Sequence, residues 1–195
     1  QALDAVLGEF LFSVCELFVD DLIIYGSTME ELIVNIGKIL QRMRDVGLRV
    51  RGSKCRFGVT CISYLGFEIT MDGYRLSASR KAVIENVAVP KNRKELRSFV
   101  GLINYFHDFV PEFSVQCKPL FTAATGKGVL EWTDELHEVF ITVKEALNKS
   151  SLLYFVDYKF PMVLRTDASN IGVGGVLFQV VEEKHRIITY LSKAF

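Results

Sequence analysis

The chain has 195 residues, half of them hydrophobic, and its 23 basic and 23 acidic side chains cancel to a net charge of zero. This composition is that of a globular protein, and the length accommodates one large domain or two small ones. No apolar run approaches the roughly 18 residues of a membrane span, and no basic-then-apolar signal opens the chain. The four cysteines form no Cys-x-x-Cys pair, which argues against zinc and favours reduced thiols. We therefore expect no membrane partner and no secretion.

Two adjacent carboxylates stand between two short apolar runs near the start of the chain. A helical pattern over residues 2–13 precedes them, and the runs at 15–19 and 22–25 are rich in β-branched and aromatic residues, which is typical of strands. Neighbouring buried carboxylates repel, so Asp20 and Asp21 imply a positive partner such as a magnesium ion. An ordinary turn is the alternative, because Asp favours turns. Both interpretations place the pair at the tip of an antiparallel hairpin.

Capping signals and turn residues divide the rest of the first half of the chain. Ser27 with Glu30 and Thr28 with Glu31 form overlapping capping boxes, which predict a helix that ends near Gly47. Strands are then expected at 48–50, 54–58 and 61–69 and, after a turn at 71–73, at 74–76. A helix beside antiparallel strands predicts an α+β fold.

The second half of the chain reads as a helical region followed by strands. Residues 77–125 are expected to be mostly helical, with one helix beginning after Asn92. Gly126-Lys127-Gly128 is the clearest linker, so we expect residues 129–195 to pack apart from the preceding residues. A helix with acids in its first turn begins after Thr133. Strands are expected at 152–155, 162–167, 173–180 and 186–191.

Charge is unevenly distributed along the chain. Residues 1–21 carry five acids and no Lys or Arg, whereas residues 42–56 carry six bases and one acid. Residues 77–126 carry seven bases and four acids, a local charge of +3. An acidic tip followed by basic flanks suits a metal site beside a phosphate backbone. A solvated charged face explains each basic cluster equally well when it is taken singly.

Besides Phe18-Val19-Asp20-Asp21, several other segments stand in a characteristic order. They are Gln1-Ala2-Leu3, Gly47-Leu48, Lys54-Cys55-Arg56-Phe57, Tyr64-Leu65-Gly66-Phe67, the run from Leu96 to Phe106, and Thr166-Asp167-Ala168-Ser169 with the glycines that follow it. In this order they resemble the reverse transcriptase and ribonuclease H region of the Pol polyprotein of gypsy-type long-terminal-repeat retrotransposons. The resemblance covers nearly the whole chain, which makes it more specific than any single motif.

The resemblance implies a fold, a function and partners. It implies the C-terminal part of a reverse transcriptase palm at 1–76, a helical thumb or connection at 77–126, and the N-terminal part of an α/β ribonuclease H-like domain at 127–195. The implied activity is RNA-directed DNA synthesis by two-metal nucleotidyl transfer. The implied partners are an RNA/DNA primer–template duplex, deoxynucleoside triphosphates and the remainder of the Pol polyprotein. The implied location is a cytoplasmic virus-like particle, the nucleus, or both.

The resemblance also implies catalytic and metal-binding residues. Asp20 would be a ligand of magnesium in a two-metal site, and Asp21 would support it. Lys54 would protonate or stabilise the departing pyrophosphate, although a surface lysine is an equally good interpretation. Asp167 matches the first metal-binding acid of the ribonuclease H fold.

Nucleic-acid contacts are implied at two places. Tyr64, Leu65 and Gly66 would lie against the primer, with the glycine allowing close approach of the backbone. A core strand with a bulge is the alternative for this segment. Arg97, on the polar side of the thumb helix, could meet a phosphate, although most such arginines are merely solvated.

Some positions depart from the family pattern. Phe18 replaces the usual Tyr, and His107-Asp108 replaces a basic pair after the thumb helix. The family's third palm carboxylate would precede Gln1, and the later ribonuclease H acids would follow Phe195. We therefore expect the isolated chain to be inactive in both reactions. The alternative is a decayed or co-opted remnant without catalysis that binds nucleic acid or a protein partner.

Overall fold

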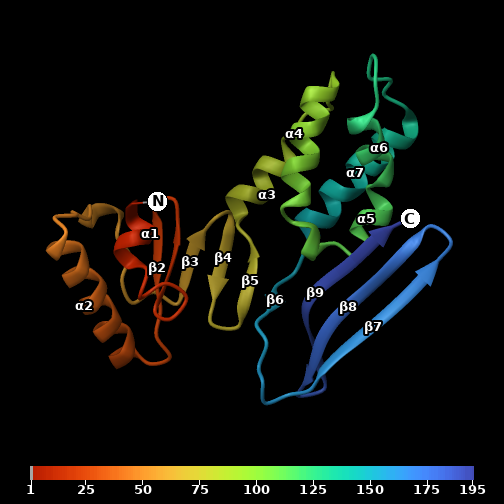
Figure 1. Cartoon of the computed structure of the whole chain (residues 1–195). Coiled ribbons are helices and arrows are strands. Elements are labelled where there is room, and N and C mark those ends of the chain that lie inside the picture. Colours follow the sequence, from red (N-terminus) through yellow and green to blue (C-terminus); the bar gives the residue numbers. More distant parts are fainter. Residues whose placement is uncertain (1) are drawn as a thin grey trace. The chain divides into compact units, whose positions relative to one another are not determined.

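The computed structural model describes residues 2–195, whose contacts divide the chain into two compact units, Gln1–Thr60 and Cys61–Phe195. Helices and antiparallel strands occur in both units (Figure 1), so the predicted α+β class is confirmed. None of the helices between residues 2 and 195 combines the length and apolarity needed to cross a bilayer. The division differs from the one expected from the linker signal, and the core of the second unit explains why.

The first unit combines helices with a β-hairpin. Its elements are α1 (Ala2–Leu7), β1 (Cys15–Phe18), β2 (Asp21–Ile24), α2 (Met29–Asp45) and the 3₁₀ helix η1 (Gly52–Lys54). Leu7, Cys15, Ile39 and Met43 form its buried core, to which α1, β1 and α2 all contribute. The two helices therefore share a small apolar core with the hairpin.

The predicted hairpin is confirmed. Phe18 pairs with Asp21, and Val19 and Asp20 form a two-residue connection in which Val19 has a φ of 59°. A positive φ is uncommon for a β-branched residue, so the hydrogen bonds of the flanking strands must hold this turn. The two carboxylates lie at its tip.

Helix α2 begins where the sequence predicts. The hydroxyl of Thr28 accepts the backbone N–H of Glu31 at 3.2 Å, and the Glu31 carboxylate accepts the backbone N–H of Ser27 at 2.7 Å. Thr28 is therefore the N-cap, as one of the two predicted capping boxes requires, but the Glu31 carboxylate accepts the N–H of Ser27 and not that of Thr28. Gly47, with a φ of 76°, follows the helix in the left-handed conformation typical of helix C-termini.

Two expectations for the first unit are wrong. The helix predicted over 2–13 ends at Leu7, whose carbonyl accepts the N–H groups of Phe10 and Leu11 in a tight turn just after Gly8. Glycine is a poor helix former, which favours termination there.

The strands predicted at 48–50 and 54–58 are also absent, and η1 is the regular element of this segment. Leu48, Val50 and Phe57 are exposed at 40–58%. Without a buried face or a partner strand, the alternation of apolar and basic residues does not produce a sheet.

The second unit contains two antiparallel sheets and a group of helices (Figure 1). The first sheet has the order β3 (Cys61–Tyr64), β4 (Phe67–Thr70), β5 (Gly73–Leu76) and β6 (Leu153–Tyr154). The helices are α3 (Ala78–Glu85), α4 (Arg93–Asn104), η2 (His107–Phe109), α5 (Phe113–Gln116), α6 (Lys118–Thr125) and α7 (Asp134–Lys149). The second sheet has the order β7 (Met162–Ser169), β8 (Gly172–Val181) and β9 (Lys184–Ala194). Predicted helices and strands after residue 77 are therefore confirmed, with shifted ends.

The single strand predicted over 61–69 is instead a hairpin. Leu65 and Gly66 both have positive φ, 53° and 87°, and Tyr64 pairs with Phe67 across them. Two consecutive left-handed residues are the geometry of a tight two-residue hairpin connection. The apolar run hid this turn because only one of its two residues is glycine.

Residues on both sides of the predicted linker share one hydrophobic core. The strand β6, which follows α7, pairs with β5, which precedes α3, through Gly73 with Tyr154 and Tyr74 with Leu153. The core combines side chains from α3, α4 and α7, including Ile84, Leu96, Phe99, Ile103, Leu136, Phe140, Val143 and Leu147. The expectation that residues 129–195 pack apart is therefore wrong, because α7 turns its apolar stripe toward the helices before it.

Two lysine side chains reinforce this junction. Lys81 of α3 donates to the carbonyls of Asn148 and Ser150 at 2.9 Å, at the C-terminal end of α7. Lys144 of α7 donates to the carbonyl of Val87 at 2.8 Å. Desolvation by burial lowers the pKa of both lysines. These contacts satisfy carbonyls that would otherwise be left at helix ends.

The second sheet is joined to the helices through α5. The backbone N–H of Ser114 donates to the Ser192 hydroxyl at 2.8 Å, and the Ser114 hydroxyl donates to the Ser192 carbonyl at 3.0 Å. A Cβ on Gly172 would lie 2.5 Å from Val115. The close packing of α5 on β8 and β9 therefore needs glycine at this position.

Replacement of Gly73 by alanine should destabilise the second unit by about 1–3 kcal/mol. A Cβ there would lie 2.0 Å from the carbonyl oxygen of Leu153, so the β5–β6 pairing would have to open. Unfolding in urea can be followed by fluorescence of Trp132, the single tryptophan, which packs on Phe140 of this core. Gly101→Ala in α4 is the matched control, since nothing lies within 4 Å of its added Cβ. It should be neutral or stabilising by up to about 1 kcal/mol. Equal destabilisation by both variants would contradict this account.

Candidate functional site

The first candidate site is the tip of the β1–β2 hairpin. Asp20 lies in the connection and Asp21 is the first residue of β2, and both side chains are exposed. Phe18 and Val19 beside them are 55% and 77% exposed. The argument that these carboxylates are buried and must be neutralised is therefore wrong, because water can solvate them. What remains is a pair of oxygen donors open to a cation.

The chemistry of this pair fits a hard divalent cation. Carboxylate oxygens are the ligands that Mg²⁺ uses in proteins, usually one or two of them together with water and substrate phosphates. Within residues 2–195, no group of three or more His, Cys, Asp or Glu side chains is placed to hold a metal ion. Asp20 and Asp21 could therefore supply some of the ligands of a magnesium ion, and not a closed protein cage.

Lys54 lies in the same unit, at the end of η1, with an exposed side chain. The segment around it is a turn and not the strand expected from the sequence: the N–H of Lys54 donates to the carbonyl of Arg51 at 2.9 Å. The assignment of Lys54 to pyrophosphate departure stays a prediction.

The second candidate site is the β3–β4 turn, formed by Leu65 and Gly66. Its flanking residue Tyr64 ends β3, and the carbonyl of Gly66 accepts the N–H of Ser77 at 3.0 Å. The turn is thereby fixed against the start of α3. The structure thus brings together Tyr64, Leu65 and Gly66 in a rigid backbone projection, as a contact with a nucleic-acid strand would require.

Helix α4 presents an exposed stripe that the sequence revealed only in part. Arg97, Gly101 and Tyr105, spaced four residues apart, are all exposed, and we call them the α4 stripe. Its last member is 52% exposed, and its ring lies 5.5 Å from the ring of Phe67 in β4. The stripe therefore leads to the strand that follows the β3–β4 turn. Counting four residues at a time along the helix from Arg97 would have identified Gly101 and Tyr105 as its neighbours on the same exposed face.

The third candidate site is Asp167 in the edge strand β7. Asp167 pairs with Gly174, so its side chain lies on the same face of the sheet as a Cβ on that glycine would. The Glu112 side chain lies over this glycine, 3.1–3.8 Å from the position of such a Cβ. Glu112 has a φ of 51°, before α5. No sequence pattern pointed to this second carboxylate on the face of Asp167, because the two residues are far apart in the chain.

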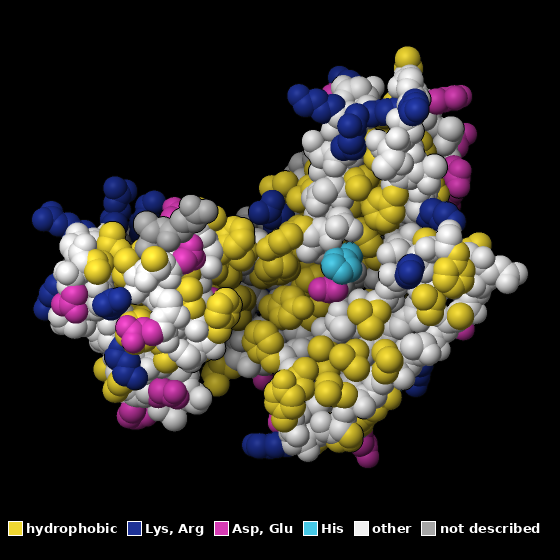
Figure 2. Space-filling view, viewed as in Figure 1, with side chains coloured by type: hydrophobic (Ala, Val, Ile, Leu, Met, Phe, Trp, Pro, Cys, Tyr) yellow, Lys and Arg dark blue, Asp and Glu magenta, His cyan; other side chains and the backbone are white. Residues whose placement is uncertain are grey.

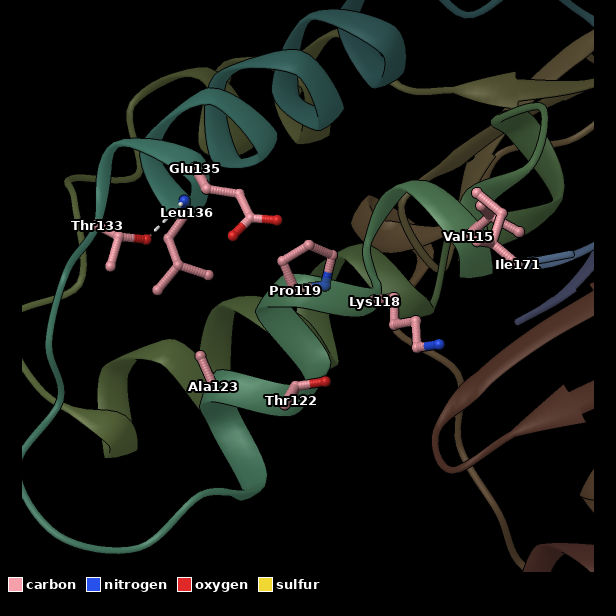
Figure 3. A pocket seen from close by; sticks show the side chains of 9 residues that line it. All are labelled: Val115, Lys118, Pro119, Thr122, Ala123, Thr133, Glu135, Leu136 and Ile171. Carbon is pink, nitrogen blue, oxygen red and sulfur yellow. Dashed lines mark hydrogen bonds between the residues drawn. The ribbon is translucent and has the colours of Figure 1, made fainter. Parts of the chain in front are cut away.

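A pocket of about 450 Å³ lies elsewhere in the second unit (Figure 3). Residues of α5, α6 and the first turn of α7 line it together with Ile171, as the labelled side chains show; they include Val115, Lys118, Pro119, Thr122 and Leu136. It contains no residue of the Asp-Asp tip, the β3–β4 turn or the α4 stripe. A long duplex binds along an extended surface, so a local pocket of this size is not the expected site for it.

Two protein families match different parts of the chain. Residues 1–69 match the family described as reverse transcriptase (RNA-dependent DNA polymerase), and residues 132–195 match the RNase H-like domain found in reverse transcriptase. This confirms the resemblance drawn from the ordered motifs, and the chain is a reverse transcriptase segment with a ribonuclease H-like domain of the retrotransposon polyprotein type.

Retrotransposon polyproteins are among the relatives of this reverse transcriptase segment. It is 28% identical to the transposon Tf2-3 polyprotein of Schizosaccharomyces pombe over 97% of its own length, and 29% identical over 92% to the Retrovirus-related Pol polyprotein from transposon 412 of Drosophila melanogaster. It spans 14% of the length of each. The activities of those whole polyproteins therefore reach this chain only as proposals.

Solved reverse transcriptase structures share this fold. The foamy viral protease-reverse transcriptase dRH in complex with double-stranded DNA matches all of this chain with a TM-score of 0.81 and 28% identity, over 34% of its own length. The foamy viral protease-reverse transcriptase in complex with an RNA/DNA hybrid matches with a TM-score of 0.79, over 26% of its length. Both neighbours hold nucleic-acid duplexes. Reverse transcriptase and ribonuclease H domains generally use divalent metal ions.

Proposed function

We propose that this segment serves RNA-directed DNA synthesis in a gypsy-type retrotransposon Pol polyprotein. Residues 1–76 would be the C-terminal part of the palm, 77–126 the thumb or connection, and 127–195 the start of the ribonuclease H-like domain. The observation that carries the proposal is the exposed Asp20-Asp21 pair at the tip of a tight hairpin, within a region that matches the polymerase family. The structural division after Thr60 separates packing units, whereas these ranges are assigned by function.

The polymerase chemistry would be shared between metal ions and protein side chains. Two magnesium ions would activate the 3′-hydroxyl and neutralise the triphosphate when bound. Asp20 would hold them, Asp21 would support it, and Lys54 would stabilise the departing pyrophosphate. Asp167 would hold a metal for RNA cleavage. The substrates would be deoxynucleoside triphosphates on a primer–template.

The protein's own surfaces would hold and orient that duplex. The β3–β4 turn presents backbone without a bulky side chain at Gly66, so a strand could approach it closely. The α4 stripe offers a cation at Arg97, open space at Gly101 and an aromatic ring at Tyr105. Arginine binds phosphates and aromatic rings contact sugars or bases. We further propose that the parent protein acts with the rest of its Pol polyprotein, in a cytoplasmic virus-like particle, the nucleus, or both.

Salt-sensitive binding of an RNA/DNA duplex by the 195-residue chain tests this proposal. Arg97→Gln should weaken binding for every duplex sequence, and should reduce the slope of log K against log salt by about 0.9. Fluorescence anisotropy with a labelled duplex measures both quantities. Lys149→Gln is the control, because it removes one charge from an exposed lysine that Glu145 already neutralises at 2.8 Å. Absence of binding by the unaltered chain at 50 mM salt would count against the duplex contacts.

A decayed or co-opted remnant is the second candidate, and one contact favours it. His107 lies 3.1 Å from Asp108, directly after the α4 stripe, where the family pattern has a basic pair. An acidic side chain there opposes contact with phosphate. A remnant would bind duplex weakly or not at all and would fail in every assay of DNA synthesis.

A further inference from the structure

Arg80, in the first turn of α3, lies against the β3–β4 turn. A Cβ on Gly66 would be 2.8 Å from Nε of Arg80, 3.3 Å from one of its terminal nitrogens and 3.4 Å from Cζ. The absence of a side chain at Gly66 therefore makes room for this guanidinium. Because the N–H of Ser77 donates to the Gly66 carbonyl, the start of α3 and the turn are fixed to each other (Figure 1).

An aromatic ring supports the guanidinium from another side. Cζ of Arg80 lies 5.9 Å from the centre of the Phe106 ring, and that ring is 99% buried in the core. A cation within about 6 Å of a ring is attracted by its π face, and a buried ring cannot move away. Arg80 is itself half-buried. Its planar head is therefore held in one place beside the turn and does not sample the surface freely.

The charge of this arginine is not neutralised within the described part of the chain. No carboxylate there forms an ion pair with Arg80, and its guanidinium donates no hydrogen bond to a described residue; only its backbone N–H does so, to the Ser77 hydroxyl at 3.2 Å. Other arginines of the same unit are engaged: Arg75 pairs with Glu68 at 2.9 Å, and Arg93 donates to backbone carbonyls of the segment before α7. A fixed, unpaired guanidinium has donors to offer to a planar or tetrahedral oxyanion.

We propose that Arg80 binds a backbone phosphate of the nucleic-acid strand that lies against the β3–β4 turn. This inference rests on the proposed function, in which that strand is the primer. Gly66 would let the strand come close, and Arg80 beside it would donate hydrogen bonds to a phosphate oxygen. Arg80 would thus be a positioning residue: it would hold the primer against the β3–β4 turn without touching the reacting atoms. The ring of Phe106 explains why arginine suits this position better than lysine.

The test measures binding of a primer–template duplex with an RNA template and a recessed DNA primer to the full 195-residue chain. Arg80→Gln should lower affinity about tenfold at 50 mM salt and reduce the salt slope by about 0.9. Arg75→Gln is the matched control, because it removes an equal charge that Glu68 neutralises, and it should change both quantities little. Arg80→Lys, which keeps the charge, should keep the slope while losing part of the affinity.

A neutral methylphosphonate placed at successive primer phosphates then locates the contact. At one primer position the methylphosphonate should weaken binding to the unaltered chain by about tenfold and should have no further effect on Arg80→Gln. The same scan on the template strand should show no such coupling.

Three outcomes would separate the inference from the function on which it rests. If the unaltered chain binds duplex and every methylphosphonate acts equally on it and on Arg80→Gln, the phosphate contact of Arg80 is refuted while the proposed function stands. If a methylphosphonate is coupled to Arg80→Gln only when it is placed in the template strand, the proposed contact with the primer is also refuted. If the unaltered chain binds no duplex, the proposed nucleic-acid face fails, and the inference fails with it. Urea unfolding followed by Trp132 fluorescence checks that each variant is folded, and Arg80→Lys carries the test if Arg80→Gln is not.

Discussion

Replacement of Asp20 by asparagine should abolish magnesium-dependent DNA synthesis, with a loss of at least about a thousandfold. The amide keeps the shape of the side chain but removes the negative charge that would hold the metal ions. Since Asp20 lies in an exposed connection, the substitution should leave folding unchanged. The measurement is incorporation of deoxynucleotides on a primed RNA template. The suitable protein is a Tf2-3 polyprotein whose matching segment is replaced by residues 1–195.

Asp45→Asn is the matched control, because it makes the same chemical change at an exposed acid at the end of α2. It should retain full synthesis. The rate of DNA synthesis by Asp21→Asn should lie between those of Asp20→Asn and Asp45→Asn if Asp21 supports the site without binding both metals. Undiminished synthesis by Asp20→Asn would refute the role of the hairpin tip. If the chimaera with the unaltered segment is itself inactive while the intact Tf2-3 polyprotein synthesises DNA, the decayed-remnant interpretation becomes the better one.

Local signals predicted the elements that local physics controls. The hairpin at Asp20 follows from two apolar runs separated by turn-forming residues. The start of α2 at Thr28, and those of α4 at Asn92 and α7 at Thr133, follow from side chains that accept backbone N–H groups three residues later. These features depend on interactions between residues at most four positions apart, so they can be predicted from short segments of the sequence.

Long-range pairing decided what the sequence could not show. The basic segment 48–58 has strand-like alternation, yet in the described structure of residues 2–195 it forms no strand. The apolar run 61–69 bends at Leu65, because its two halves pair with each other. The Gly126–Gly128 segment is a connection, yet α7 beyond it enters the same core as α4. Whether a glycine-rich connection separates domains depends on what the next helix packs against, and that contact is made far away in the chain.

The candidate sites follow the same division. Motif order identified Asp20, Asp167 and the β3–β4 turn, since each lies within a short characteristic segment. Glu112 and Arg80 could not be found in that way, because each gains its meaning from a residue on another element, Gly174 and Gly66 respectively. In both cases the glycine is the informative partner: it marks a place where another side chain needs the room.

Replacement of Asp167 by asparagine should abolish RNA cleavage in the chimaera, by at least about a thousandfold, and should leave DNA synthesis intact. Asp167 lies on β7, an edge strand exposed along its whole length, and belongs to a different packing unit from Asp20. Its Oδ1 accepts the N–H of Ala168 at 2.9 Å, a hydrogen bond that the Oδ1 of asparagine can keep, so the strand should not be disturbed. The measurement is degradation of a labelled RNA strand within an RNA/DNA hybrid.

Glu183→Gln provides the control for this variant, since it removes an acid from the β8–β9 connection of the same sheet. The Glu183→Gln variant should cleave RNA at the unaltered rate. Glu112→Gln is informative in addition, because it removes the carboxylate that shares a sheet face with Asp167. A large loss of cleavage in Glu112→Gln would show that both acids serve the metal, whereas an unchanged rate would make Glu112 a packing residue over Gly174. If Asp167→Asn cleaves RNA normally, the ribonuclease assignment of this strand is refuted, and its likeness to that domain is one of fold alone.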